Sequence, residues 1–171
     1  MLFATVDISN AFHSCWLPPP YDTMFVVAVV NESGISKHYW RTLPFGWDKS
    51  PAVFENLMLH FLEQYLQDHI CILVYLDDIL LASRDTQLLA STTLKLRDKL
   101  VEEGFLMSMK KCVLEPSLQI DWLGKHLSSF ETGVVISVSV DDILDAACLA
   151  VWCCSKYWSW PVLTTVDTCL L

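Results

Sequence analysis

The sequence has few basic residues, no low-complexity segment and no uninterrupted apolar run long enough to span a membrane. Its 171 residues include 11 Lys and Arg but 20 Asp and Glu, which gives a formal net charge of −9. This acidity argues weakly against nucleic-acid binding. Asp77 and Asp78 interrupt the longest apolar stretch and Asp7 interrupts the first, so we expect no transmembrane segment, secretory signal or membrane partner. The expected location is intracellular, either cytoplasmic or nuclear.

The seven cysteines form no CxxC pair and have no histidine at zinc-binding spacing. Reduced thiols are therefore favoured over a disulfide framework. A hydrophobic fraction of 53% and seven tryptophans argue against disorder. The length suits one domain or most of one. Six of the eleven basic residues lie between positions 84 and 111, so a basic segment remains within an otherwise acidic chain.

Hydrophobic periodicity predicts a mixed order of strands and helices. Strands are expected over 2–6, 24–30, 35–42, 105–109, 119–127 and 134–140, and on both sides of the Asp-Asp pair. Helices are expected from Ser50, as N-cap, to position 66, from the cap Asp85 to about 103, and over 139–154. This order predicts an α+β fold with helices on one face of an antiparallel sheet, in a split βαβ, ferredoxin-like arrangement.

The stretch over 69–83 is the most informative, because two adjacent carboxylates interrupt what reads as a strand buried on both faces. A tight turn between Leu76 and Ile79 would bring both carboxylates toward one accessible spot. A divalent cation is the natural counter-charge for unpaired carboxylates in an apolar setting. In the predicted fold Asp7 ends the first strand nearby, so three carboxylates could meet. For an isolated Asp-Asp pair, a polar hairpin tip without a ligand is the alternative.

Five blocks of sequence, in order, resemble the palm of a reverse transcriptase of the LTR-retrotransposon and retrovirus type. They are Phe-Ala-Thr-Val-Asp-Ile-Ser-Asn-Ala-Phe at 3–12, Leu-Pro-Phe-Gly-Trp-Asp-Lys-Ser-Pro-Ala-Val-Phe at 43–54, Tyr-Leu-Asp-Asp at 75–78, the segment 104–112 ending in Lys-Lys-Cys, and Trp-Leu-Gly at 122–124. The resemblance covers residues 2 to about 128. It implies a polymerase palm with a primer-grip-like hairpin over 1–140 and a divergent or truncated tail over 141–171, with fingers and thumb largely absent.

The resemblance also implies an activity and its residues. An RNA-directed DNA polymerase adds deoxynucleoside triphosphates to a DNA primer on an RNA or DNA template. Two Mg²⁺ ions, for which Mn²⁺ could substitute, would be held by Asp7, Asp77, Asp78 and the backbone carbonyl of Ile8. Nucleotide contacts would come from Phe12, Phe45, Gly46, Trp47, Lys110 and Lys111, and primer contacts from Tyr75, Leu76, Trp122, Leu123 and Gly124.

Plainer explanations remain open for several of these residues. Phe12 and Tyr75 could be core aromatics, 45–47 a structured turn, the lysine pair solvated, and Trp122 a tryptophan buried beneath a sheet. For the whole chain, the alternatives are a catalytically inert retroelement relic or interaction module that retains the fold, and a different metal-dependent phosphotransferase or nuclease.

Overall fold

The computed structural model describes residues 1–65, 69–130, 133–138 and 162–166. The strands are β1 (Leu2–Ser9), β2 (Phe25–Asn31), β3 (Gly34–Trp40), β4 (Ile70–Tyr75), β5 (Asp78–Ser83), β6 (Leu106–Met107), β7 (Val113–Ser117), β8 (Gln119–Trp122), β9 (Lys125–Phe130), β10 (Gly133–Val138) and β11 (Val162–Val166). The helices are α1 (Ser50–Leu62) and α2 (Thr86–Glu102), with short 3₁₀ turns η1 (Ala11–Ser14), η2 (Tyr21–Thr23) and η3 (Glu63–Tyr65). The helix expected over 139–154 lies outside the described residues.

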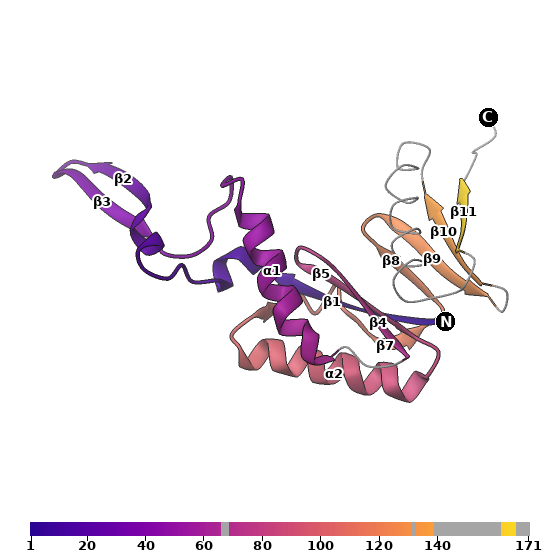
Figure 1. Ribbon diagram of the computed structural model, residues 1–171. Helices are drawn as coiled ribbons and strands as arrows, with labels where there is room; N and C mark the ends of the chain where they lie inside the picture. The colour runs from indigo at the N-terminus through magenta and orange to yellow at the C-terminus, as the bar shows by residue number, and fades with distance from the viewer. Residues whose placement is uncertain (66–68, 131–132, 139–161, 167–171) are drawn as a thin grey trace.

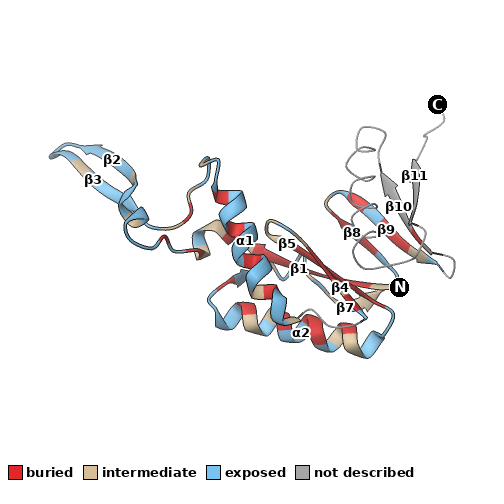
Figure 2. Cartoon of the chain, viewed as in Figure 1, coloured by how far each residue is buried: buried red, intermediate tan, exposed pale blue. Residues whose placement is uncertain are grey.

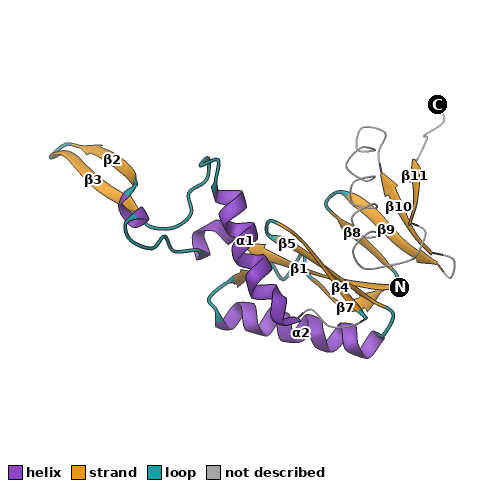
Figure 3. Ribbon diagram, viewed as in Figure 1, coloured by secondary structure: helices purple, strands orange, loops and turns teal. Residues whose placement is uncertain are grey.

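The central sheet has the order β4-β5-β1-β6, and β7 also pairs with β1. Every pairing in it is antiparallel. Figure 3 shows the two helices packed along this sheet, and both contribute to one apolar cluster with it: Phe54 of α1 and Leu96 of α2 join Val6 and Ile79. The predicted α+β architecture, with helices on one face of an antiparallel sheet, is confirmed.

Successive side chains along each strand point to opposite faces of the sheet. In β1, Ala4, Val6 and Ile8 lie in the cluster beneath the helices. Phe3 instead lies in a second cluster with Trp122 of β8 and Leu127 of β9. Because neighbouring side chains in a strand point to opposite faces, Thr5 and Asp7 share the face of Phe3. The helices therefore cover one face of the sheet (Figure 1), and Thr5 and Asp7 place polar residues on the other face toward the end of β1.

The strands β2 and β3, close to the strands expected over 24–30 and 35–42, pair as an antiparallel hairpin, which projects from the rest of the molecule (Figure 1). Almost all of its residues are exposed, as the pale blue ribbon of Figure 2 shows. The exposed side chains include Val30 and Ile35, which lie directly opposite each other. The hairpin therefore has little apolar support from the core.

Two predicted helix features are wrong. Lys49, not Ser50, is the N-cap of α1, and the Ser50 hydroxyl is buried and donates a hydrogen bond to the Pro44 carbonyl at 2.7 Å. Helix α1 also ends at Leu62, where a 3₁₀ turn replaces its last expected turn. For α2 the predicted cap is confirmed, because Asp85 accepts hydrogen bonds from the backbone of Gln87 and Leu88. No described helix is long and apolar enough to cross a membrane.

Several strands also differ from the prediction. The strand expected over 119–127 is two strands, because Leu123 and Gly124 form a turn with φ of 51° and 71°. Strands β9 and β10 pair antiparallel, with Gly133 opposite Phe130. Strand β7, which contains Pro116, and β11, which pairs in parallel with β10, were not expected. A proline within a segment argues against a strand, so β7 could not be predicted from strand propensity.

Candidate active site

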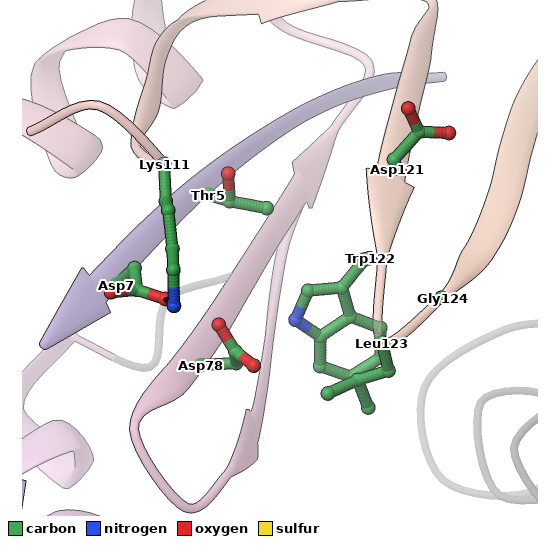
Figure 4. Close-up of a pocket in the computed structure, with 8 residues that line it drawn as sticks. All are labelled: Thr5, Asp7, Asp78, Lys111, Asp121, Trp122, Leu123 and Gly124. Carbon is green, nitrogen blue, oxygen red and sulfur yellow. Dashed lines mark hydrogen bonds and ion pairs between the residues drawn. The ribbon is translucent and has the colours of Figure 1, made fainter. Parts of the chain in front are cut away.

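Three residues of the first and third sequence blocks form a row across the central sheet. Asp78 of β5 lies opposite both Asp7 of β1 and Tyr75 of β4. The Ile8 N–H donates to the Asp77 carbonyl at 2.9 Å, which makes Asp7 and Asp78 a non-hydrogen-bonded pair. In such pairs the Cα atoms are only about 4.5 Å apart and the side chains lie closest. The sheet therefore holds two carboxylates against each other on one face (Figure 4).

Burial, Asp7 and Asp77 all disfavour the charged form of Asp78. Burial, a hydrogen bond with Asp7 and the charges of Asp7 and Asp77 raise the pKa of Asp78 from 3.8 to about 6, and the Lys111 ammonium opposes the shift. The Asp7 carboxylate is only 4% exposed. Like charges directly opposite each other in a sheet are destabilising. At neutral pH the pair therefore requires cationic compensation.

Lys111 supplies a cation at this pair. Its Nζ lies 3.0 Å from Asp7 Oδ2, and the hydrogen bond and charge of Asp7 raise the pKa of the ammonium. The rest of the lysine side chain is largely exposed, so it reaches the buried carboxylate from the surface. Lys110, the other lysine named from the sequence, is exposed on the same turn. The geometry thus distinguishes the two lysines, which the sequence did not.

A cavity of about 300 Å³ opens over the carboxylates. Its lining comes from β1, β5, the Lys111 turn, β8 and the β8–β9 turn (Figure 4): Thr5, Asp7, Asp78, Lys111, Asp121, Trp122, Leu123 and Gly124. The Trp122 indole is buried, and its Nε1 has no hydrogen-bond partner among the described residues. In Figure 4 this nitrogen lies on the Asp78 side of the ring. The cavity is therefore lined by three carboxylates, those of Asp7, Asp78 and Asp121, and by the ammonium of Lys111, with the buried Trp122 N–H beside it.

Asp77 differs from its two companions. It lies with Leu76 in the two-residue turn between β4 and β5, where Leu76 has a φ of 52°. Its charge contributes to the raised pKa of Asp78, but Asp77 does not line the cavity. Over the described part of the chain, no three His, Cys, Asp or Glu side chains are arranged to hold a metal. The structure therefore brings Asp7 and Asp78 together, with Asp77 adjacent at the turn.

The aromatic residues of the first two blocks form a separate group. Phe12 is half-buried, and its ring centroid lies 5.4 Å from that of Phe45 and 5.6 Å from that of Phe54 in α1. Phe45 is 66% exposed. Gly46 has a φ of 83°, which a glycine adopts without strain, and Trp47 packs on Phe25 at 5.2 Å. Phe12 is thus a bridge from the core to an exposed aromatic ring.

The residues named as primer contacts are divided between two turns. Tyr75 is 57% exposed and Leu76 is half-buried at the β4–β5 turn. Trp122 at the end of β8 and the turn residues Leu123 and Gly124 line the cavity opposite Asp78. Ile8 is fully buried in β1. The burial of Trp122 agrees with a tryptophan packed beneath a sheet. Its indole N–H has no partner among the described residues, so it is available to donate a hydrogen bond.

Comparisons with known proteins agree with this geometry. The family model described as reverse transcriptase (RNA-dependent DNA polymerase) matches residues 1–127. The chain belongs to this family. The relationship that the five sequence blocks suggested is therefore confirmed.

Two relatives and two solved structures show how much of a reverse transcriptase is present. The chain is 34% identical over 129 residues to the Gag-Pro-Pol polyprotein of Human T-cell leukemia virus 3 (strain Pyl43), covering 72% of this chain and 9% of the relative. It is 33% identical over 129 residues to the Gag-Pol polyprotein of Walleye dermal sarcoma virus, covering 74% and 7%. Two structures of the foamy viral protease-reverse transcriptase are 27% identical in sequence to this chain. The complex with RNA/DNA hybrid has a TM-score of 0.61, and the match covers 78% of this chain and 17% of the viral chain. The complex with dsDNA has a TM-score of 0.56, and the match covers 78% of this chain and 26% of the viral chain. The chain thus spans less than a tenth of these polyproteins.

Sequence reasoning missed several residues around the carboxylates of this reverse transcriptase chain. Thr5 lines the cavity two positions before Asp7, so the two-residue period of the strand could have identified it. Asp121 also lines the cavity and contacts His126 at 2.7 Å. Cys112 accepts a hydrogen bond from the Asp7 N–H at 3.3 Å. No sequence pattern predicts that contact, because it depends on where β6 and β7 break their pairing with β1.

Proposed function

We propose that this chain carries the catalytic centre of an RNA-directed DNA polymerase, which adds deoxynucleotides to the 3′-hydroxyl of a DNA primer on an RNA or DNA template. The observation that carries the proposal is the closely opposed pair Asp7 and Asp78 within the segment that matches the family. The similar foamy viral structures are complexes with RNA/DNA hybrid or dsDNA, which supports a nucleic-acid partner.

The residues at the Asp7–Asp78 pair fit divalent cations. Carboxylate oxygens are the hard ligands that Mg²⁺ prefers. Burial and, after it, the neighbouring carboxylates Asp7 and Asp77 raise the pKa of Asp78, so a bound cation would favour its charged form. Asp7 and Asp78 would hold the ions, with Asp77 and the Ile8 carbonyl as further ligands. When bound, two Mg²⁺ ions would supply the charge that activates the 3′-hydroxyl and stabilises the leaving pyrophosphate. Mn²⁺ would be an alternative ion.

The remaining residues would position substrate and move a proton. Lys111, whose ammonium already lies at the site, would donate a proton toward the leaving pyrophosphate. Phe12 would block a ribose 2′-hydroxyl, and Phe45 with Gly46 and Trp47 would support the incoming nucleotide. These roles follow from the family resemblance, and the exposed ring of Phe45 beside Phe12 supports them.

The primer strand would lie along the β8–β9 turn. Trp122, Leu123 and Gly124 form one wall of the cavity above Asp78, and the Trp122 N–H has no partner within the described chain. Tyr75 and Leu76 lie at the neighbouring turn. A primer terminus between these two turns would lie next to the carboxylates, and catalysis would depend mainly on placement and charge compensation.

Primer extension tests the proposal. The full chain is incubated with a DNA primer on an RNA template, deoxynucleoside triphosphates and Mg²⁺. We expect incorporation that falls by at least about a hundredfold in Asp78→Asn, the scale of losing a main electrostatic group. Asp98→Asn on the surface of α2 is the matched control and should keep the wild-type rate. Folded wild-type protein that incorporates no nucleotide would contradict the proposal.

A catalytically inert interaction module is the second candidate. It is favoured by one observation: throughout the described ranges, no side chains form a three-ligand metal group. This candidate predicts that the chain binds an RNA/DNA hybrid equally well with Mg²⁺ or EDTA and extends no primer. Strand cleavage without nucleotide incorporation would instead indicate a metal-dependent nuclease.

A further inference from the structure

We propose that Cys112 is a positioning residue, whose thiol fixes the backbone of Asp7 and thereby places Lys111 at the carboxylate pair. The proposal rests on the proposed function, because it assigns a role within the same site. Cys112 would act through Asp7 and Lys111, without touching substrate.

The backbone of Asp7 has an unusual environment for a strand residue. Since the Ile8 N–H points toward β5, the Asp7 N–H points to the opposite edge of β1. On that edge β7 pairs with Phe3 and Thr5, and β6 pairs with Ile8 and Ser9. No strand of the described chain lies opposite Asp7 in this gap. A buried N–H without a partner would cost stability, so the gap requires an acceptor.

The thiol of Cys112 fills that gap. Its Sγ accepts the Asp7 N–H at 3.3 Å and lies 3.8 Å from the Asp7 carbonyl as a weak donor. Burial raises the pKa of this thiol, which favours the neutral form that can serve both roles. The Asp7 carbonyl also accepts the Ser108 N–H at 2.9 Å. Cys112 and Ser108 therefore replace the missing strand partner.

The same contacts fix the turn that carries Lys111. The N–H groups of Lys111 and Cys112 both donate to the Ser108 carbonyl, at 2.8 and 3.2 Å, which closes the turn. Both ends of this turn are thus attached to the backbone of Asp7. Lys111 lies between them, and its Nζ returns to the Asp7 carboxylate at 3.0 Å. Loss of the thiol contact would loosen the C-terminal end of the turn, adjacent to Lys111.

Amide hydrogen exchange of the full chain tests the backbone contact without any ligand. In Cys112→Ala we expect the Asp7 amide to exchange about fivefold faster, the factor that one ordinary hydrogen bond contributes. Cys112→Ser, which retains a donor and acceptor, should restore most of the protection. Cys71→Ala in β4 is the matched control and should leave Asp7 unchanged. Equal exchange of Asp7 in wild type and Cys112→Ala would overturn the proposal.

Primer extension then tests the effect on Lys111. Cys112→Ala should lower kcat about fivefold with little change in KM, and the loss should disappear when Lys111 is already alanine, since both changes act through one contact. An equal loss in the presence and absence of the Lys111 side chain would refute the positioning of Lys111. The exchange experiment requires no polymerase activity, so failure of the proposed function would leave its result interpretable.

Discussion

At the scale of single residues, the site is governed by two carboxylates that the sheet brings together at its narrowest spacing. Asp7 is buried and Asp78 is half-buried, and the Lys111 ammonium contacts the Asp7 carboxylate. A sequence selected only for stability would not place like charges directly opposite each other. The local cost of this arrangement is what motivates a cation-dependent function.

The raised pKa of Asp78 predicts a pH dependence of stability. Its folded-state pKa of about 6 exceeds the ordinary value of 3.8, so the folded protein binds the proton more tightly than the unfolded chain. The free energy of unfolding should therefore fall as pH rises from about 4 to about 6, and the loss is complete above that range.

Asp78→Asn should remove this slope, because an amide does not titrate. Urea denaturation in EDTA across this pH range measures it, and the variant should be more stable than wild type above about pH 6. Parallel pH profiles for the two proteins would show that Asp78 titrates normally.

The two neighbouring lysines allow a matched comparison. Lys111→Ala leaves the buried Asp7 carboxylate without its ammonium, so stability in EDTA should fall at neutral pH. Lys110→Ala removes an exposed lysine from the same turn and should have little effect. Thermal unfolding of both variants tests this difference. Similar midpoints for the two would indicate that the Lys111 contact contributes nothing to the folded state.

At the scale of elements, the sequence predicts most strands and both described helices because their signals are local. The cap Asp85 and the two strands of the β2–β3 hairpin were identified from residue type and spacing. The turn between β4 and β5 lies at 76–77, one residue before the turn expected between Leu76 and Ile79. The N-terminus of α1 was not, because Ser50 has a tertiary partner in the Pro44 carbonyl that competes with a capping role. Helix propensity along the sequence cannot predict a hydrogen bond of this kind.

Ser50 therefore links α1 to the turn that presents Phe45. Its hydroxyl is buried, and removal would leave the Pro44 carbonyl without this donor. Ser50→Ala should lower the free energy of unfolding by about 1 kcal/mol. Ser91→Ala is the control, since Ser91 makes a similar bond to the Leu88 carbonyl on the exposed side of α2. Equal stabilities of the two variants in urea denaturation would refute the link.

At the scale of the whole molecule, the apolar core lies around the central sheet, and the β2–β3 hairpin lies outside it (Figure 2). Val30 and Ile35 face each other across the hairpin and are 75% and 72% exposed. Their joint replacement by threonine should change the free energy of unfolding by no more than about 0.5 kcal/mol. Leu81→Ala in the fully buried core should cost about 2 to 5 kcal/mol. Urea denaturation measures both variants. If the hairpin variant lost as much free energy of unfolding as Leu81→Ala, the hairpin would not lie outside the core.

The candidate site was predictable only where strand alternation and short motifs determine it. The pairing of Asp7 with Asp78, 71 positions apart, follows from the order of elements that the sequence predicts. The contacts of Cys112 and Ser108 do not, because they occupy a break in pairing between β6 and β7. The choice of Lys111 over Lys110 also required the folded turn.

Cation binding by the Asp7–Asp78 pair is the central claim, and titration of the full chain with Mn²⁺, followed by electron paramagnetic resonance of the free ion, tests it most directly. We predict that Asp78→Asn weakens Mn²⁺ binding at least about tenfold, as loss of a direct ligand should. Asp98→Asn on the surface of α2 should bind as the wild type does. Equal Mn²⁺ affinity in wild type and Asp78→Asn would contradict the account.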